Sequence, residues 1–197
     1  KVMHSGCPAA MEAARAFDNV QVIDTGHLSS GQGLLVLEAC RMVEEGKSPA
    51  EITAHLAKLS SRVHTSFVVD DLEFLHRAGQ VSQKVAELTR SFMVRPILKL
   101  RRGRMVVGGV CFGSREHAWR SYIAGVLRKK PFIDTRVAFV TYVGLSKREM
   151  DWIREEIENH IHFEKIYFQK ASPAIAVNCG PGTFGVLVQE KLSFSGQ

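Results

Sequence analysis

The chain has 197 residues, of which 45% are hydrophobic, and its formal net charge is +6. This composition is typical of globular domains with a buried core, and no apolar run approaches the roughly 20 residues that span a bilayer. The cysteines show no CxxC spacing, which predicts buried structural thiols in a reducing cytoplasm and disfavours a disulfide framework. They are Cys7, Cys40, Cys111 and Cys179.

Two basic clusters supply much of the excess positive charge. They comprise Lys99, Arg101, Arg102 and Arg104, and then Arg128, Lys129 and Lys130. A basic surface of this kind attracts nucleic acid, anionic lipid or an acidic protein. Nucleic acid is an unlikely partner, because the clusters lack the interleaved aromatic residues of single-strand binding surfaces. An anionic membrane surface stays open as a partner.

The first third of the chain predicts alternating strands and helices. In order, we expect a short helix ending near Phe17, a strand over 20–23, a loop over 25–33, and helices over 34–45 and 49–62. Ser48 to Glu51 forms a capping box, with Pro49 at the first helical position. The apolar strand that ends at Asp24 favours an α/β layer.

The rest of the chain continues in the same style. We expect strands over 66–69, 137–143 and 165–169, a hairpin of 95–100 with 105–112 around Gly103, and a strand pair of 174–177 with 184–188 around Gly180-Pro181-Gly182. We expect helices from Asp71 to Gly79, over 82–93, from Ser114 to Lys130, and from a second capping box at Ser146 to about 161. The whole pattern predicts the α/β class.

The loop over 25–33 is the strongest candidate for a binding site on residue types alone. A small-residue loop between a strand and a helix is where α/β folds place ligands, and a helix N-terminus suits an anion. The loop lacks the ending of a phosphate-binding P-loop, and a flexible turn explains it equally well. His27 is the most notable histidine, but a lone histidine in a loop is usually solvated, so we expect it to be solvated. The pattern predicts no catalytic constellation and no metal site.

Several stretches taken in order resemble the DegV family, which are bacterial fatty-acid-binding proteins. The matching pieces are Ser5-Gly6 before an Ala-rich helix, Val22 to Thr25 with Ser29 and Gly31, Asp71 to Leu75 with Ala78 to Ser82, Arg95 to Leu98 before Gly103, and Gly180 to Thr183. Each motif is modest, but their order and spacing together are specific.

The resemblance implies a two-domain architecture. Residues 1–64 would be the C-terminal portion of a first α/β domain with a parallel sheet, whose front portion is absent here, and residues 65–197 a second α/β domain with a mixed sheet. It further implies a long-chain fatty acid between the domains, with its tail in an apolar tunnel. Family members present the head group to a partner kinase, so the chain itself is expected to be no enzyme and to need no cofactor.

The resemblance also implies the head-group site. The residues are Ser5, Gly6, Ser29, Ser30, Gln80, Asn178 and Gly180. Here Gln80 stands where the family has Arg, Asn178 where it has His, and Cys7 where it has Thr. Neutral amides bind a carboxylate more weakly than cations do, which indicates an altered ligand preference or lost binding.

Two alternatives remain open at this point. In the first, the site is degenerate and the chain is an interaction module that docks a partner through the basic surface around Arg101, Arg102, Arg104 and Arg128. In the second, the chain is an enzyme acting on an acyl ligand. The second is weaker, because no base and nucleophile pair is evident in the sequence.

Overall fold

The structure, a computed structural model, describes residues 6–79, 81–84, 86–87, 93–101 and 103–192. Its helices are α1 (Gly6–Ala14), α2 (Ser29–Glu44), α3 (Pro49–Ser60), α4 (Glu73–Arg77), α6 (Arg115–Val126), α7 (Lys147–Glu158) and α8 (Pro173–Cys179), with a 3-10 segment η1 (Leu127–Phe132). Its strands are β1 (Val63–His64), β2 (Ser66–Val68), β3 (Val94–Arg101), β4 (Arg104–Phe112), β5 (Val137–Tyr142), β6 (Lys165–Lys170) and β7 (Phe184–Gln189).

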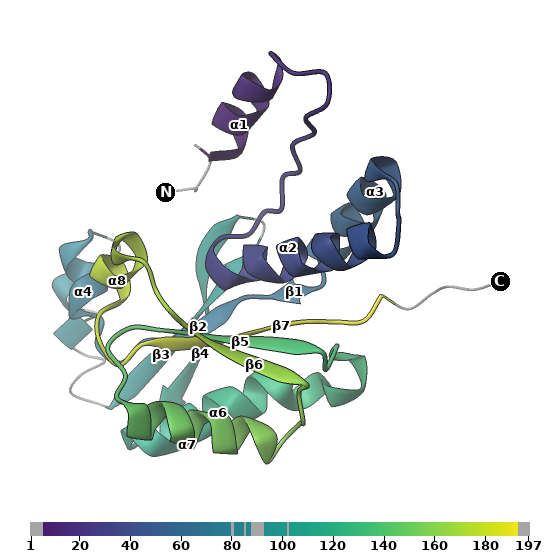
Figure 1. Cartoon of the computed structure of the whole chain (residues 1–197). Coiled ribbons are helices and arrows are strands. Elements are labelled where there is room, and N and C mark those ends of the chain that lie inside the picture. Colours follow the sequence, from purple (N-terminus) through teal and green to yellow (C-terminus); the bar gives the residue numbers. More distant parts are fainter. Residues whose placement is uncertain (1–5, 80, 85, 88–92, 102, 193–197) are drawn as a thin grey trace.

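These strands form one mixed sheet in the order β4-β3-β2-β7-β5-β6, and β1 pairs with β7 (Figure 1). β5 and β6 are parallel and are joined through α7, whereas the other pairings are antiparallel. A parallel pair needs such a crossover helix, while antiparallel pairs need only short turns. The α/β class and the mixed sheet expected from the sequence are confirmed.

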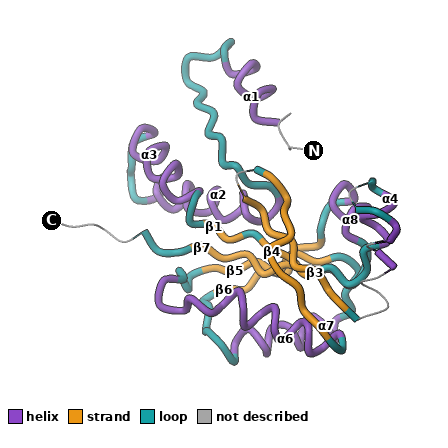
Figure 2. Tube along the Cα trace, turned by 180° about the vertical axis from the view of Figure 1, so that it is seen from behind, coloured by secondary structure: helices purple, strands orange, loops and turns teal. Residues whose placement is uncertain are grey.

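One face of the sheet is covered by α6 and α7 (Figures 1 and 2). Alternate residues of the central strands point to this face, among them Val140 on β5 and Phe184 on β7, both fully buried. The ring of Phe184 lies edge-on to Trp119 and Tyr122 of α6, with centroids 5.0 and 5.5 Å apart. These residues belong to a single apolar cluster that continues under α7 through Ile153.

The opposite face carries two separate apolar clusters. Leu34 and Leu35 of α2 pack with Leu56 of α3 and with Leu187 of β7. A second cluster forms under α4 and β3, around Leu75. α1 stands away from both, at the end of an extended segment, and none of its residues is buried (Figure 1).

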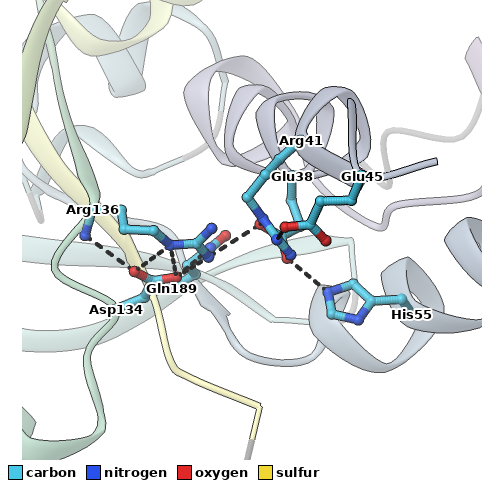
Figure 3. A network of polar contacts seen from close by, with 7 residues as sticks. All are labelled: Glu38, Arg41, Glu45, His55, Asp134, Arg136 and Gln189. Carbon is cyan, nitrogen blue, oxygen red and sulfur yellow. Dashed lines mark hydrogen bonds and ion pairs between the residues drawn. The ribbon is translucent and has the colours of Figure 1, made fainter. Parts of the chain in front are cut away.

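An ionic network fastens α2 and α3 to the sheet (Figure 3). The buried carboxylate of Glu38 on α2 accepts hydrogen bonds from His55 Nε2 of α3 at 2.9 Å and from Arg136 Nη2 at 3.1 Å. Asp134 binds Arg136 Nε at 3.0 Å and Gln189 Nε2 of β7 at 3.1 Å. Polar bonds therefore add to the apolar contacts that hold α2 and α3 on the sheet.

Three expected elements are wrong. Residues 20–23 form no strand and run as irregular chain. The strand that follows them most closely in sequence, β1, pairs with β7. α2 begins at Ser29, five residues before the expected start. The expected strand 174–177 is helical, because Ser172 and Pro173 occupy the N-cap and first position of α8.

Local signals at other boundaries are confirmed. Ser48 and Ser146 each form complete capping boxes at the starts of α3 and α7. Gly103 turns the β3–β4 hairpin with a φ of +70°. Of the helix expected over 82–93, residues 83–84 and 86–87 are helical, and residues 85 and 88–92 lie outside those described. The domain boundary at residue 64 stays an expectation, and β1 on one side of it joins the sheet formed by residues on the other.

Candidate functional site

The first turn of α2 carries two of the expected ligand-binding serines. Ser29 has a φ of +53°, which non-glycine residues rarely adopt, and it follows an extended Leu28. Ser30 is buried, and its hydroxyl lies 2.7 Å from that of Thr141 on β5. This side-chain bond holds the start of α2 against the C-terminal half of β5.

The turn at Gly180-Pro181-Gly182 lies at the end of the same strand. Val143 N donates to Thr183 O at 2.9 Å, and Gly182 N donates to Val143 O at 2.9 Å. Gly180 has a φ of +73°, and a Cβ there would lie 2.2 Å from the ring of Phe74 on α4. Only glycine fits this position, because both its backbone conformation and its packing exclude a side chain.

The structure thus brings together two segments that are 150 residues apart in the sequence. Ser30 contacts Thr141 and the Gly180 turn contacts Val143, two residues further along. Between them, Thr141 pairs with Gly185 of β7 on the sheet face that carries two apolar clusters. Neither Thr141 nor Gly185 is among the residues predicted from the sequence, although the alternation of β5 and β7 could have assigned both to this face.

The other expected site residues lie in varied places. The Asn178 side chain is partly buried on α8, and its Nδ2 donates to Ala174 O at 2.8 Å in the same helix. Gly6 lies in the first turn of α1 and lines a different cleft, described below. Ser5 and Gln80 fall outside the described residues. Ser29, Ser30 and Gly180 are therefore the part of the expected set that the structure places at one strand end.

Four charged side chains form a network of ion pairs beside the Gly180-Pro181-Gly182 turn. Asp70 pairs with Arg95 of β3 at 2.7 Å and with Arg115 of α6 at 3.4 Å, and Arg115 also binds Glu149 of α7 at 2.6 Å. A Cβ on Gly182 would lie 2.7 Å from Arg115 Nη2. Both arginines beside the turn are thus already matched by carboxylates.

A large open cleft of about 2050 Å³ lies elsewhere, beneath the segment that joins α1 to α2. It is lined by residues 22–28 of that segment, by the ends of β1, β2 and β3, and by the end of α6. Its lining is mixed, with apolar residues such as Val22 and Val126 beside the charged Lys99 and Arg128.

His27 on the wall of this cleft is not solvated as expected. Its Nε2 donates to Ser60 O at 2.8 Å, and its Nδ1 lies 3.2 Å from Thr65 Oγ1. Burial lowers the pKa of His27 below 6.5; the bond to Ser60 opposes this and the nearby His64 adds to it. A neutral imidazole with Nε2 protonated satisfies both contacts, so His27 ties the segment to α3 and to the β1–β2 junction.

Other expectations from the sequence can be compared with the part of the chain that the structure describes. All four cysteines are free, but only Cys111 and Cys179 are buried, whereas Cys40 is exposed. Within the described ranges, no cluster of His, Cys, Asp or Glu could hold a metal ion, and no helix is long and apolar enough to cross a bilayer.

Comparison with known proteins gives consistent matches. The model of the DegV family of uncharacterised proteins matches residues 5–191. A DegV domain-containing protein of Deinococcus radiodurans is 29% identical over 189 residues, covering 92% of this chain and 64% of that protein. The chain therefore spans less than two thirds of the length of this relative.

Solved structures share the fold. A DegV family protein from Thermus thermophilus, described for its fatty acid binding, is 30% identical with a TM-score of 0.78, covering 94% of this chain and 66% of that one. The Fatty Acid Kinase (Fak) B3 protein of Streptococcus pneumoniae, loaded with linoleic acid, has a TM-score of 0.76 at 14% identity, covering 94% and 67%. The second likeness concerns the fold alone. Since the family model matches nearly the whole sequence, this chain belongs to the DegV family.

Proposed function

We propose that the protein binds a long-chain fatty acid on the sheet face between the first turn of α2 and the Gly180 turn. The observation that carries this proposal is the meeting of Ser30 and the Gly180 turn at one end of β5. The Thermus thermophilus relative, which is described for its fatty acid binding, supports the same ligand class.

The apolar tail would lie along this sheet face. The clusters under α2–α3 and under α4 are separate, and the row of Phe67, Gly185 and Thr141 crosses the sheet from the α4 cluster, against which Phe67 packs, to β5. Phe67 and Thr141 are partly exposed, and Gly185 adds no side chain that would block the row. Each methylene buried there would contribute about 0.8 kcal/mol, so the tail would supply most of the affinity.

The head group would meet neutral donors. Ser29 and Ser30 stand at one side, and the family resemblance adds Ser5, Gly6, Gln80 and Asn178 to the proposed site, of which Gly6 lies on α1 beside the other cleft. The nearest described arginines, Arg95 and Arg115, are each paired with a carboxylate. Hydrogen bonds from neutral groups to a carboxylate are roughly half as strong as charge-assisted ones, so we expect weak discrimination between a fatty acid and a neutral amphiphile of equal tail length.

The remaining parts of the proposal follow from the family resemblance. The protein would hold its ligand without transforming it, and a separate kinase would act on the presented head group. It would work in the cytoplasm, as the unpaired spacing of its cysteines suggests. The ligand would lie between a first domain ending near residue 64 and a second domain comprising 65–197.

Mass spectrometry of solvent extracts from the purified protein, beside a mock purification, tests the ligand class. We expect a stoichiometric long-chain fatty acid or another single-tailed amphiphile. Titration of the delipidated protein with fatty acids of increasing length should then show affinity rising with each methylene. An extract matching the mock, together with no binding at micromolar concentrations, would contradict the proposal and favour the interaction-module alternative.

A matched pair of variants locates the head group. Ser30→Ala removes the hydroxyl at the proposed site, and we expect about five- to tenfold weaker binding from the loss of one hydrogen bond. Ser121→Ala removes an exposed hydroxyl on α6, on the opposite face of the sheet, and should leave the affinity unchanged. Equal affinities for the two variants would place the head group elsewhere.

A further inference from the structure

The turn that opens α2 is strained and has no capping side chain of its own. Ser29 has a φ of +53°, a left-handed conformation that costs a serine free energy, and it follows an extended Leu28. Leu28 occupies the N-cap position, but its side chain makes no hydrogen bond to the first turn. Such a conformation persists only where the surrounding structure fixes it. The contacts on each side of the turn therefore determine where Ser29 and Ser30 lie.

On its C-terminal side, the turn is held by Ser30. The hydroxyl of this buried serine lies 2.7 Å from that of Thr141 on β5. The neighbouring Ser29 is exposed and so remains accessible to a ligand. This side-chain contact fixes one end of the turn and leaves the preceding chain to be held by other groups.

On its N-terminal side, the turn is held by His27, two residues before Ser29. The ring donates from Nε2 to Ser60 O at the end of α3 at 2.8 Å, and its Nδ1 lies 3.2 Å from Thr65 Oγ1 at the β1–β2 junction. The backbone is fixed as well, since His27 N donates to Thr25 Oγ1 at 3.2 Å. Both ring nitrogens are thus occupied within the protein, so His27 can act on a head group only through the residues that it holds.

His27 and Thr65 also pack directly against the first turn of α2. A Cβ on Gly31 would lie 2.4 Å from Thr65 Oγ1 and 3.3 Å from His27 Nδ1. The absence of a side chain at Gly31 therefore allows α2 to approach this pair closely. The His27–Thr65 pair and the Ser30–Thr141 contact hold the two sides of one short turn.

We propose that His27 is a positioning residue for the ligand head group: by holding the chain against Ser60 and Thr65, it fixes the strained turn that presents the two serines of α2. This role rests on the proposed fatty acid binding, because it concerns the residues assigned to the head group. Loss of His27 should weaken head-group binding without changing the contribution of the tail.

Titration of the delipidated protein with myristic, palmitic and stearic acids separates the two contributions. His27→Leu removes both ring contacts, and we expect about tenfold weaker binding of each acid, because release of the strained turn misplaces both serines. The gain in affinity per methylene should stay as in the wild type. His27→Gln keeps a donor for Ser60 O but loses the contact with Thr65, so its affinity should lie between those of His27→Leu and the wild type. Equal affinities for His27→Leu and the wild type would overturn the proposal.

A matched pair at Thr65 tests the same contact from the other side. Thr65→Val removes the hydroxyl beside His27 Nδ1 and should weaken binding severalfold, whereas Thr65→Ser keeps the hydroxyl and should bind as the wild type does. His117→Leu is the control, since this exposed histidine lies on α6, and it should leave the affinity unchanged. If His27→Leu does not fold, equal binding by the two Thr65 variants would overturn the proposal by itself.

A double-mutant cycle shows whether His27 acts through the turn. Residues that act through one structural element are not independent, so His27→Leu should cost little further affinity once Ser30→Ala has removed the contact with Thr141. Fully additive losses would mean that His27 affects binding by another route, and would overturn the proposal.

Amide hydrogen exchange of the ligand-free protein tests the turn without any fatty acid. His27→Leu should speed exchange over residues 28–32 and leave exchange in β5 and β7 unchanged, which a general loss of stability would not do. Unchanged exchange over 28–32 would overturn the proposal. A wild-type protein that binds no fatty acid would contradict the proposed function itself, whereas a wild type that binds no better than His27→Leu contradicts the role of His27 alone.

Discussion

The two faces of the sheet are stabilised in different ways. Under α6 and α7, one apolar cluster runs without a break from Trp119 to Ile157. On the other face, the apolar residues divide into two clusters, and the ionic network centred on Glu38 completes the attachment of α2 and α3 (Figure 3). One face is therefore held by a single continuous core, whereas the other is held by two separate clusters and, at α2 and α3, by polar bonds.

The continuous core and the proposed ligand site therefore lie on opposite faces of the sheet. Ser30 and the Gly180 turn sit where the divided face meets the end of β5, and both are attached to strands whose other side belongs to the continuous core. The first turn of α2 is therefore held by the sheet, while the rest of the helix is held by its apolar cluster with α3 and β7 and by the polar network. Substitutions on the two faces should differ accordingly.

The largest effect is expected at the centre of the continuous core. Phe184→Ala removes a fully buried ring that contacts Trp119 and Tyr122, and should lower the free energy of unfolding by about 3–5 kcal/mol. Urea denaturation followed by tryptophan fluorescence measures this loss. Val43→Ala, on the exposed side of α2, is the control and should change stability by about 0.5 kcal/mol or less. Similar losses for the two variants would contradict the packing described for Phe184.

A smaller effect is expected where the divided face depends on charge. Glu38→Gln leaves Arg136 and His55 without their shared carboxylate and should cost about 2 kcal/mol. This figure is below the roughly 3–5 kcal/mol expected for a fully buried ion pair, because Arg41 and Arg136 remain 36% and 40% exposed. Chemical denaturation at neutral pH measures the loss, and an unchanged midpoint would show that the network does not contribute to stability.

The pH dependence of the stability lost in Glu38→Gln tests the role of the Glu38 carboxylate independently. Burial alone would raise the pKa of Glu38, but the hydrogen bond from Arg41 and the charge of Arg136 outweigh it and lower the pKa below 4.5. A lowered carboxyl pKa stabilises the fold above 4.5, and this stabilisation disappears as the pH falls through the folded-state value. The stability gap between wild type and Glu38→Gln should therefore narrow in acid. A gap that stays constant from neutral to acidic pH would contradict this assignment.

The smallest effects on stability are expected at the two capping boxes, one on each face of the sheet. Ser48 and Ser146 form equivalent capping boxes at the starts of α3 and α7, and either Ser→Ala change should cost about 1 kcal/mol. The consequences should differ in extent, because α7 covers the continuous core and α3 the divided face. Hydrogen exchange should show local opening confined to α2 and α3 for Ser48→Ala, and faster exchange across β5 and β6 for Ser146→Ala. Identical exchange patterns would erase the proposed distinction between the faces.

Signals carried by a few neighbouring residues were reliable in the sequence. The capping boxes and the hairpin turn at Gly103 follow from local hydrogen bonds or glycine conformations, which need no distant partner. The short apolar run 174–177 was ambiguous, because four apolar residues fit a strand or a buried helix equally well. The preceding Ser172 and Pro173 are typical of a helix N-terminus and could have identified this run as the helix α8.

The candidate site depended on contacts that no local pattern contains. The ordered motifs were enough to indicate the family, and with it Ser29, Ser30 and Gly180 as site residues. The contact of Ser30 with Thr141, the ring of Phe74 against Gly180 and the partners of His27 arise only when the sheet brings distant segments together.

The sequence by itself therefore determined the capped starts of α3 and α7, the tight turns and the family, because these rest on short-range chemistry. Only the tertiary structure decided which sheet face has a continuous core and which strand end collects the serines and the glycine turn. Each of these depends on strand order and register, which bring together residues up to 150 positions apart.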